Sequence, residues 1–242
     1  MSIWGSLIGG MIGFSLGGPF GMLLGSLLGG KISRSRSAAG FSAINQGQRM
    51  FALSLIVLSA KISKADGQVS KEELIAVRDK LKIPENELDQ VGKIFNKAKE
   101  ESTGYEPYAQ QIAQFYKGNI NVLEEVINIL FYIAESDGEV TKSEIEMIEN
   151  IAKIFGLSEK QYLSIKESRK GSDKLNPYIV LESKPDDDLS EIRKKYLLLS
   201  KQHHPDLLLS KGVPQEVIEE SKNKMRAINS AWDQIQKLKK AN

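Results

Sequence analysis

The amino-acid sequence predicts an all-α protein, and three observations lead to this fold class. The chain begins with an uncharged glycine-rich segment, its middle repeats one helix–turn–helix pattern, and near its carboxy terminus two long helical stretches flank a proline. Apolar residues recur at helical spacing around the repeat and the proline, as on the buried face of a helix. We therefore expect a glycine-zipper transmembrane segment, a central helical domain and a carboxy-terminal helical hairpin.

The length and charge of the chain limit its organisation and its partners. Its 242 residues suffice for two compact domains and a tail. We place an anchor at residues 1–30, a linker at 31–46, a helical domain at 47–165, a linker at 166–175 and a second domain at 176–242. The net charge of +2 does not favour nucleic acid as a partner. Without cysteine, the chain forms neither disulfides nor a thiolate zinc site.

The first thirty residues have the length and composition of a membrane anchor. Residues 1–30 contain no ionisable side chain, and a helix of that length crosses a bilayer. Positive charge comes only afterwards, at Lys31, Arg34 and Arg36, whereas a cleavable signal peptide carries it first. The sequence therefore predicts a retained single-pass anchor with its amino terminus outside and the rest of the chain cytoplasmic.

Glycine recurs at every fourth position of this segment. On a helix, that spacing forms a groove in which a second backbone packs closely, which predicts a homodimer through the anchor. Pro19 and the Gly17-Gly18 pair also fit a flexible hairpin or re-entrant segment, since both weaken a straight helix. The recurring glycines are Gly5, Gly9, Gly13, Gly17, Gly21, Gly25 and Gly29.

The middle of the chain contains an internal repeat, in which SKADGQVSKEEL matches AESDGEVTKSEI. Each copy lies between an apolar helical stretch and an amphipathic one. The Asp-Gly pair of each copy supplies the turn. Ser70 with Glu73, and Thr141 with Glu144, have the spacing of a capping box for the next helix.

The acidic residues of the repeat also suggest a weak divalent-metal site at Asp66, Glu73, Asp137 and Glu144. An EF-hand loop needs an oxygen ligand at its first position, where the two copies have Ile62 and Ile133. A turn and a helix cap explain the acids without an ion. We therefore favour the structural interpretation and expect no metal and no cofactor.

The carboxy-terminal segment has the sharpest pattern. Pro177 can open a short helix, and in the helix that follows, Ile192, Tyr196, Leu199 and His203 share one face, which assigns His203 to packing. Pro205 disfavours helical geometry at the preceding residue, so His204 should leave the helix and be exposed. A second long helix pairs with the first through its apolar residues, which are Val217, Met225, Ile228, Trp232 and Ile235.

These patterns resemble known families. Residues 47–165, with their repeated Asp-Gly turns, resemble the TerB family, whose members are all-helical. Residues 176–238 look like a J domain. A short helix comes first, and the stretch HHPDLLLSKGVPQEV then lies between two long helices. The order of anchor, TerB-like domain and J domain is similar to DjlA-type co-chaperones of the bacterial inner membrane.

The resemblance implies that His204, Pro205 and Asp206 contact a DnaK-type chaperone and trigger its ATP hydrolysis. It also implies a basic docking surface on the preceding helix, made of Arg193, Lys194, Lys195 and Lys201. The sequence departs from the family at three usually basic positions, which hold Leu197, Leu198 and Leu207. This departure predicts weaker electrostatic docking or a more apolar partner groove.

Two further expectations concern function. The two adjacent histidines, without cysteine or a glycine-rich phosphate loop, provide no nucleophile-and-base arrangement, so we expect the chain not to be an enzyme. The alternative to a co-chaperone is a membrane stress-response scaffold in which the TerB-like domain binds metal or a protein partner.

Overall fold

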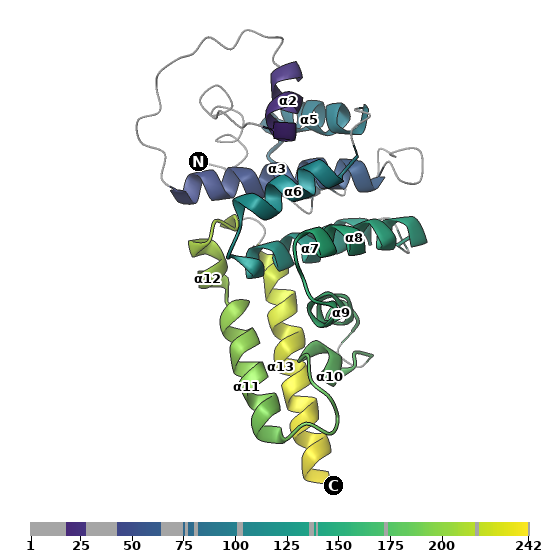
Figure 1. The fold of residues 1–242 in the computed structure, drawn as a ribbon, viewed down its shortest axis with the longest axis vertical. Helices are drawn as coiled ribbons and strands as arrows, with labels where there is room; N and C mark the ends of the chain where they lie inside the picture. The colour runs from purple at the N-terminus through teal and green to yellow at the C-terminus, as the bar shows by residue number, and fades with distance from the viewer. Residues whose placement is uncertain are drawn as a thin grey trace.

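The computed structural model describes residues 18–27, 43–63, 75, 77–79, 82–100, 104–135, 138, 140–171, 174–215 and 218–241. Within these residues the chain is helical and contains no strand, which confirms the predicted fold class (Figure 1). The elements are α2 (Gly18–Leu27), α3 (Ala43–Ser63), η1 (Glu85–Glu87), α5 (Leu88–Glu100), α6 (Glu106–Phe115), α7 (Ile120–Ala134), α8 (Lys142–Ile154), α9 (Glu159–Glu167), α10 (Pro177–Val180), α11 (Leu189–Gln202), α12 (Pro205–Ser210) and α13 (Ile218–Ala241).

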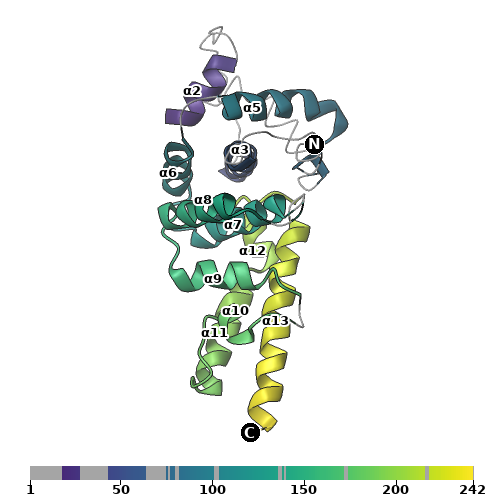
Figure 2. The same ribbon diagram turned by 90° about the vertical axis from the view of Figure 1, so that its right-hand side faces the viewer.

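Helices α2 to α9 pack around one core and are called the first domain below. Helices α3 and α7 form its centre. Figure 2 shows α3 end-on, enclosed by α2, α5, α6 and the α7–α8 layer. Residues 49–63 of α3 are all buried, as are thirteen of the fifteen residues of α7. A helix that is apolar on every side belongs inside a domain, so these two helices organise the others around them.

Helix α2 lies in the segment that the sequence assigns to the membrane. In the structure it packs on the first domain, with Phe20 and Leu23 fully buried. The Phe20 ring meets Tyr108 of α6 edge-on at 5.0 Å, and its backbone N–H donates to Gln111 Oε1 at 3.2 Å. No helix in the described part of the chain has the length and apolar character needed to span a bilayer. Five of the recurring glycines lie outside the described residues, namely Gly5, Gly9, Gly13, Gly17 and Gly29.

The second copy of the repeat has the predicted cap. The Thr141 hydroxyl accepts from the Glu144 backbone N–H at 3.3 Å, and the Glu144 carboxylate accepts from the Thr141 N–H at 2.8 Å. This reciprocal pair satisfies two donors at the start of α8. The corresponding turn of the first copy, including Asp66 and Glu73, lies outside the described residues.

The carboxy-terminal hairpin has its own core. Helices α11 and α13 run side by side in both views, with α10 against α13 (Figures 1 and 2). Tyr196 and Trp232 stack across the pair, with ring centroids 5.2 Å apart and an interplanar angle of 9°. Of the residues predicted for this core, Val217 lies outside the described residues. The buried apolar residues are Leu175, Val180, Leu181, Ile192, Leu199, Ala227, Ile228, Ala231 and Ile235.

The segment that joins α11 to α13 belongs to the other core. Leu208 of α12 and Val213 after it are fully buried among the apolar residues of the first domain, and Ile218 at the start of α13 joins them. The hairpin therefore meets the first domain at the end that carries His204, and the carboxy terminus lies at the other end (Figure 1).

Candidate partner-binding loop

The chain between α11 and α12 turns where the sequence predicts. Helix α11 ends at Gln202, and His204 has φ −65° and ψ 132°, an extended conformation. Pro205 causes this break because its ring clashes with a helical preceding residue. The same proline then occupies the first position of α12, where its missing N–H is not needed. The sequence did not predict α12, the short helix that follows the bend.

His204 and Asp206 form the exposed tip of the bend. The Asp206 N–H donates to His204 Nδ1 at 3.2 Å, and the Asp206 carboxylate lies 3.7 Å from the same nitrogen. The side chains are 54% and 87% exposed. Among the described residues, Nε2 of His204 has no hydrogen-bond partner, so this nitrogen and the Asp206 carboxylate are both open to a partner.

The predicted basic surface divides into two groups. Arg193 and Lys201 are exposed and form no ion pair with any described residue. Lys194 pairs with Glu191 at 2.7 Å, also in solvent. Lys195 is different: its ammonium group lies 2.9 Å from the Asp187 carboxylate and donates to the Glu182 carbonyl, which ties it to the start of the hairpin. Arg193 and Lys201 are therefore the two cations best placed for a partner.

Two leucines interrupt this basic surface. The side chains of Leu197 and Leu198 are 54% and 55% exposed on α11, between Arg193 and Lys201. Leu207, the third of the unusual leucines, is only half-buried on α12. At such exposure Leu197 and Leu198 are not part of the hairpin core.

The opposite side of the bend is attached to the first domain. Nε2 of His203 lies 3.2 Å from Oε2 of Glu124 on α7, and both side chains are about 95% buried or more. The Asn121 amide on the same helix donates to the Gln202 carbonyl at 3.3 Å. His203 is buried as predicted, but it faces a carboxylate of another domain.

The glycines at this junction approach closely. A Cβ placed on Gly212 would lie 2.9 Å from the Cα of Gly47 in α3. Gly212 also has φ +93°, a conformation that disfavours a side chain. Tyr116 donates from its hydroxyl to the Gly47 carbonyl, so α3, α6 and the loop before α13 meet at one place.

Buried charges continue from the bend along the junction. Nζ of Lys224 on α13 donates to the hydroxyls of Ser164 and Ser168 at 2.8 and 3.0 Å. Burial lowers the pKa of Lys224 to about 8, although the carboxylates around it act in the opposite direction. Burial also raises the pKa of Glu125, the neighbour of Glu124. For Glu124 itself, burial is the largest effect and raises the pKa, but His203, Lys224 and Gln161 together outweigh it, so the pKa is lowered.

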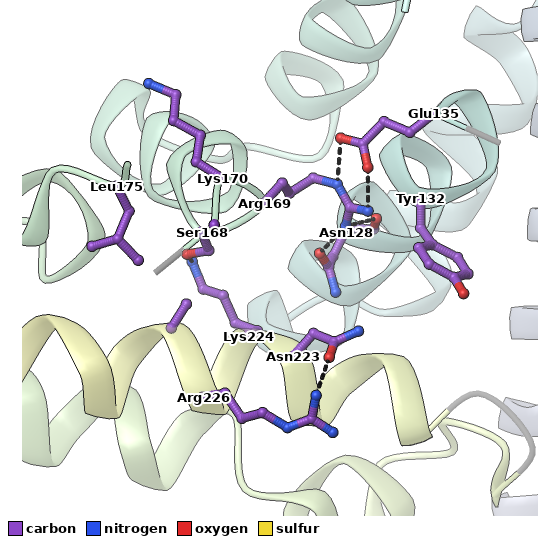
Figure 3. A pocket seen from close by; sticks show the side chains of 12 residues that line it. Asn128, Tyr132, Glu135, Ser168, Arg169, Lys170, Leu175, Asn223, Lys224 and Arg226 are labelled. Atoms are coloured by element: carbon purple, nitrogen blue, oxygen red, sulfur yellow. Dashed lines mark hydrogen bonds and ion pairs between the residues drawn. The ribbon is translucent and has the colours of Figure 1, made fainter. Parts of the chain in front are cut away.

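A cleft opens beside Lys224 between the two domains (Figure 3). Its volume is about 490 Å³. The Arg169 guanidinium lies at its centre and donates through two nitrogens to the Glu135 carboxylate at 2.6 and 2.7 Å, and to Asn128 Oδ1 at 2.9 Å. These bonds join the end of α9 to α7. The lining residues are Asn128, Tyr132, Glu135, Ser168, Arg169, Lys170, Gly171, Leu175, Asn223, Lys224, Arg226 and Ala227.

The sequence analysis did not identify Glu124 or Lys224 as functional residues. For Glu124, the sequence contains one signal that could have shown it. The stretch NVLEEVINIL has two glutamates inside an apolar helix. Such acids are seldom buried without a partner, so they indicate a second charged or polar surface. The partners lie about 80 to 100 positions further along the chain, which sequence spacing does not show.

Of the four candidate metal residues, only Glu144 lies in the described part of the chain. Glu144 is occupied by its helix cap, and Asp66, Glu73 and Asp137 lie outside the described residues. Among the residues described, no group of three histidine or acidic side chains has the arrangement of a metal site.

Comparison with known proteins adds an independent line of evidence. Residues 52–167 match the family of the tellurite resistance protein TerB, and residues 1–39 match the co-chaperone DjlA transmembrane domain. The chain is 28% identical to the co-chaperone protein DjlA of Vibrio vulnificus, with 86% of this chain and 87% of that protein covered. It is 25% identical to the DjlA proteins of Photorhabdus laumondii and Escherichia coli K12, with similar coverage. No solved structure matches.

Together, these matches support a membrane co-chaperone, and the helical fold agrees with the all-helical TerB match. The two family matches and the relatives along most of the chain support a DjlA-type co-chaperone. Neither family match extends beyond residue 167, and the matches give no support to the predicted homodimer.

Proposed function

We propose that this chain is a membrane-anchored J-domain co-chaperone that stimulates ATP hydrolysis by a DnaK-type chaperone and recruits it to the membrane. The observation that carries the proposal is the exposure of His204 and Asp206 at the tip of a bend between paired helices. The likeness to DjlA co-chaperones over most of the chain supports the same role.

The groups of the bend have distinct parts in this proposal. The Asp206 carboxylate pairs with a basic residue of the chaperone, and Nε2 of His204 supplies a directional hydrogen bond. Pro205 holds the bend in shape before docking, so little conformational entropy is lost on binding. Arg193 and Lys201 speed the encounter by attracting an acidic surface. Hydrolysis itself belongs to the partner, and this chain contributes no catalytic group.

The test is a steady-state ATPase assay of the cognate DnaK-type chaperone with the full-length chain in lipid vesicles. His204→Gln should abolish stimulation. Lys237→Gln, which removes an exposed charge at the far end of α13, should leave it unchanged. Equal stimulation by the wild type and His204→Gln would reject the mechanism and favour the scaffold function.

We further propose that residues 1–30 cross the inner membrane once, with the amino terminus outside, which requires α2 to exchange its contacts with α5 and α6 for lipid. The match to the DjlA transmembrane domain and the basic residues that follow the segment support this topology. Because the chain has no cysteine, single introduced cysteines report sidedness cleanly. In intact cells stripped of their outer membrane, an impermeant maleimide should label Ser2→Cys and not Ser210→Cys. The reverse pattern would overturn the orientation.

A further inference from the structure

The bend between α11 and α12 has two sides of opposite character. His204 and Asp206 are exposed, whereas the adjacent His203 is buried against the first domain, 3.2 Å from Glu124. The interdomain hydrogen bond and the proposed partner contact thus involve two consecutive residues. The position of His204 is therefore coupled to that bond through a single peptide unit.

The first domain holds the bend on both flanks. Before the bend, Asn121 donates to the Gln202 carbonyl and Glu124 accepts from His203, so one face of α7 contacts two consecutive residues. After the bend, Leu208 and Val213 are fully buried in the first domain's core. These attachments lie on either side of residues 204–206 and leave His204 and Asp206 exposed.

Glu124 is the polar centre of this attachment. Its second oxygen accepts from Gln161 Nε2 of α9 at 2.6 Å, which orients the carboxylate toward His203. Burial makes the bond consequential, because a buried donor that loses its acceptor costs far more than an exposed one. Nδ1 of His203 has no partner among the described residues, so Nε2 makes the only hydrogen bond of this ring within that part of the chain.

We propose that Glu124 is a positioning residue for the partner-binding bend, acting through His203, and that the TerB-like domain is the platform that presents His204 and Asp206 to the chaperone. This inference rests on the proposed co-chaperone function. It gives the central domain a part in the contact between the bend and the chaperone. The bend activates the chaperone while its two flanks are attached to the first domain, because His204 and Asp206 are exposed in that arrangement.

The experiment uses the full-length chain in lipid vesicles and four variants. Glu124→Leu leaves the His203 N–H without an acceptor, and we expect the maximal ATPase stimulation to fall about tenfold. Glu124→Gln keeps an acceptor oxygen at that position and should remain within about twofold of the wild type. Glu135→Leu removes another glutamate at the end of α7 that pairs with Arg169, far from the bend, and should leave stimulation unchanged.

Asn121→Ala covers the case in which Glu124→Leu does not fold, because it removes only the bond to the Gln202 carbonyl. We expect a fall of about threefold in maximal stimulation. Either an increase in stimulation or wild-type stimulation by both Asn121→Ala and a folded Glu124→Leu overturns the proposal. An increase would mean that docking inhibits the bend.

Amide hydrogen exchange separates this inference from the proposed function, because it needs no chaperone. In Glu124→Leu, and more weakly in Asn121→Ala, the amides of residues 203–208 should exchange about tenfold faster, while those of α8 keep their rates. If exchange responds in this way but the wild type fails to stimulate the chaperone, the co-chaperone function is rejected. The activating role of the attached bend is then rejected as well. If the wild type stimulates, His204→Gln does not, and exchange is unaltered, only the positioning role is rejected.

Discussion

The Nε2 atom of His203 lies 3.2 Å from the Glu124 carboxylate, at the point where the carboxy-terminal hairpin meets the TerB-like domain. The next residue, His204, is half-exposed and belongs to the proposed contact with a DnaK-type chaperone. The two adjacent histidines therefore have different roles. His203 attaches the bend to the TerB-like domain, and His204 remains available to a partner.

The two exposed cations of α11 should control the rate and salt dependence of chaperone docking. We expect the double variant Arg193→Ala, Lys201→Ala to raise the half-maximal concentration for ATPase stimulation about fivefold at low salt. The difference should shrink toward 1 M salt, where the screening length is about 3 Å. Lys194→Ala is the control, because this lysine already pairs with Glu191 and should matter less. A salt-independent loss would contradict an electrostatic role.

The leucine pair on α11 should act as an apolar contact for the chaperone. Burying the remaining exposed surface of Leu197 and Leu198 is worth about 1 to 2 kcal/mol together. Replacing both with lysine should therefore weaken docking about tenfold in a titration with the cognate chaperone. Leu238→Lys, at a similarly exposed position near the carboxy terminus, should have no effect. Equal or tighter binding of the double lysine variant would show that the partner groove is acidic instead.

The approach of Gly212 to Gly47 should make Gly212→Ala strongly destabilising. The new methyl group would lie 2.9 Å from a backbone Cα in a backbone conformation of φ +93°, and we expect the free energy of unfolding to fall by about 2 to 3 kcal/mol. Gly156→Ala isolates the conformational part, because its φ is +78° but no atom lies within 4 Å of the added carbon. That control should lose about 1 kcal/mol in denaturant unfolding. Equal losses for the two variants would argue against close packing at the junction.

The buried ammonium of Lys224 should make stability rise with pH in the alkaline range. Burial lowers its pKa to about 8, from 10.5 in the unfolded chain, and Glu124, Glu125 and Glu182 are the carboxylates that act against this shift. Between these two values the unfolded chain binds more protons at this site than the folded one. Lys224 alone therefore makes the free energy of unfolding increase as pH rises from 8 to about 10.

Lys224→Met should remove this contribution and flatten the dependence over the same window. Lys117→Met, at an exposed position in the first domain, serves as the control and should follow the wild type. Urea unfolding at three pH values between 8 and 10 measures the effect. Parallel curves for Lys224→Met and the wild type would show that the ammonium is not desolvated in solution.

Local features of the fold could be predicted because near neighbours in the chain cause them. Pro205 forces His204 out of the helix by a clash within one peptide unit, and Thr141 caps α8 through a residue three positions away. The apolar face with Ile192 and Leu199 follows from helical periodicity alone. These features need no knowledge of what the segment packs against.

The surroundings of the bend were decided by tertiary structure. Periodicity predicted that His203 is buried but not that it faces Glu124. The family resemblance implied a basic surface that includes Lys195, but this lysine pairs with Asp187 in the structure. The uncharged amino-terminal segment predicted a bilayer span, whereas the described part, Gly18–Leu27, packs on α5 and α6 in the structure. An apolar sequence indicates that a segment is removed from water. Whether it packs against lipid or against other helices depends on the surfaces that the folded chain places beside it. For this protein, the sequence therefore determined the exposed histidine and aspartate, and the meeting of two domains determined how they are held.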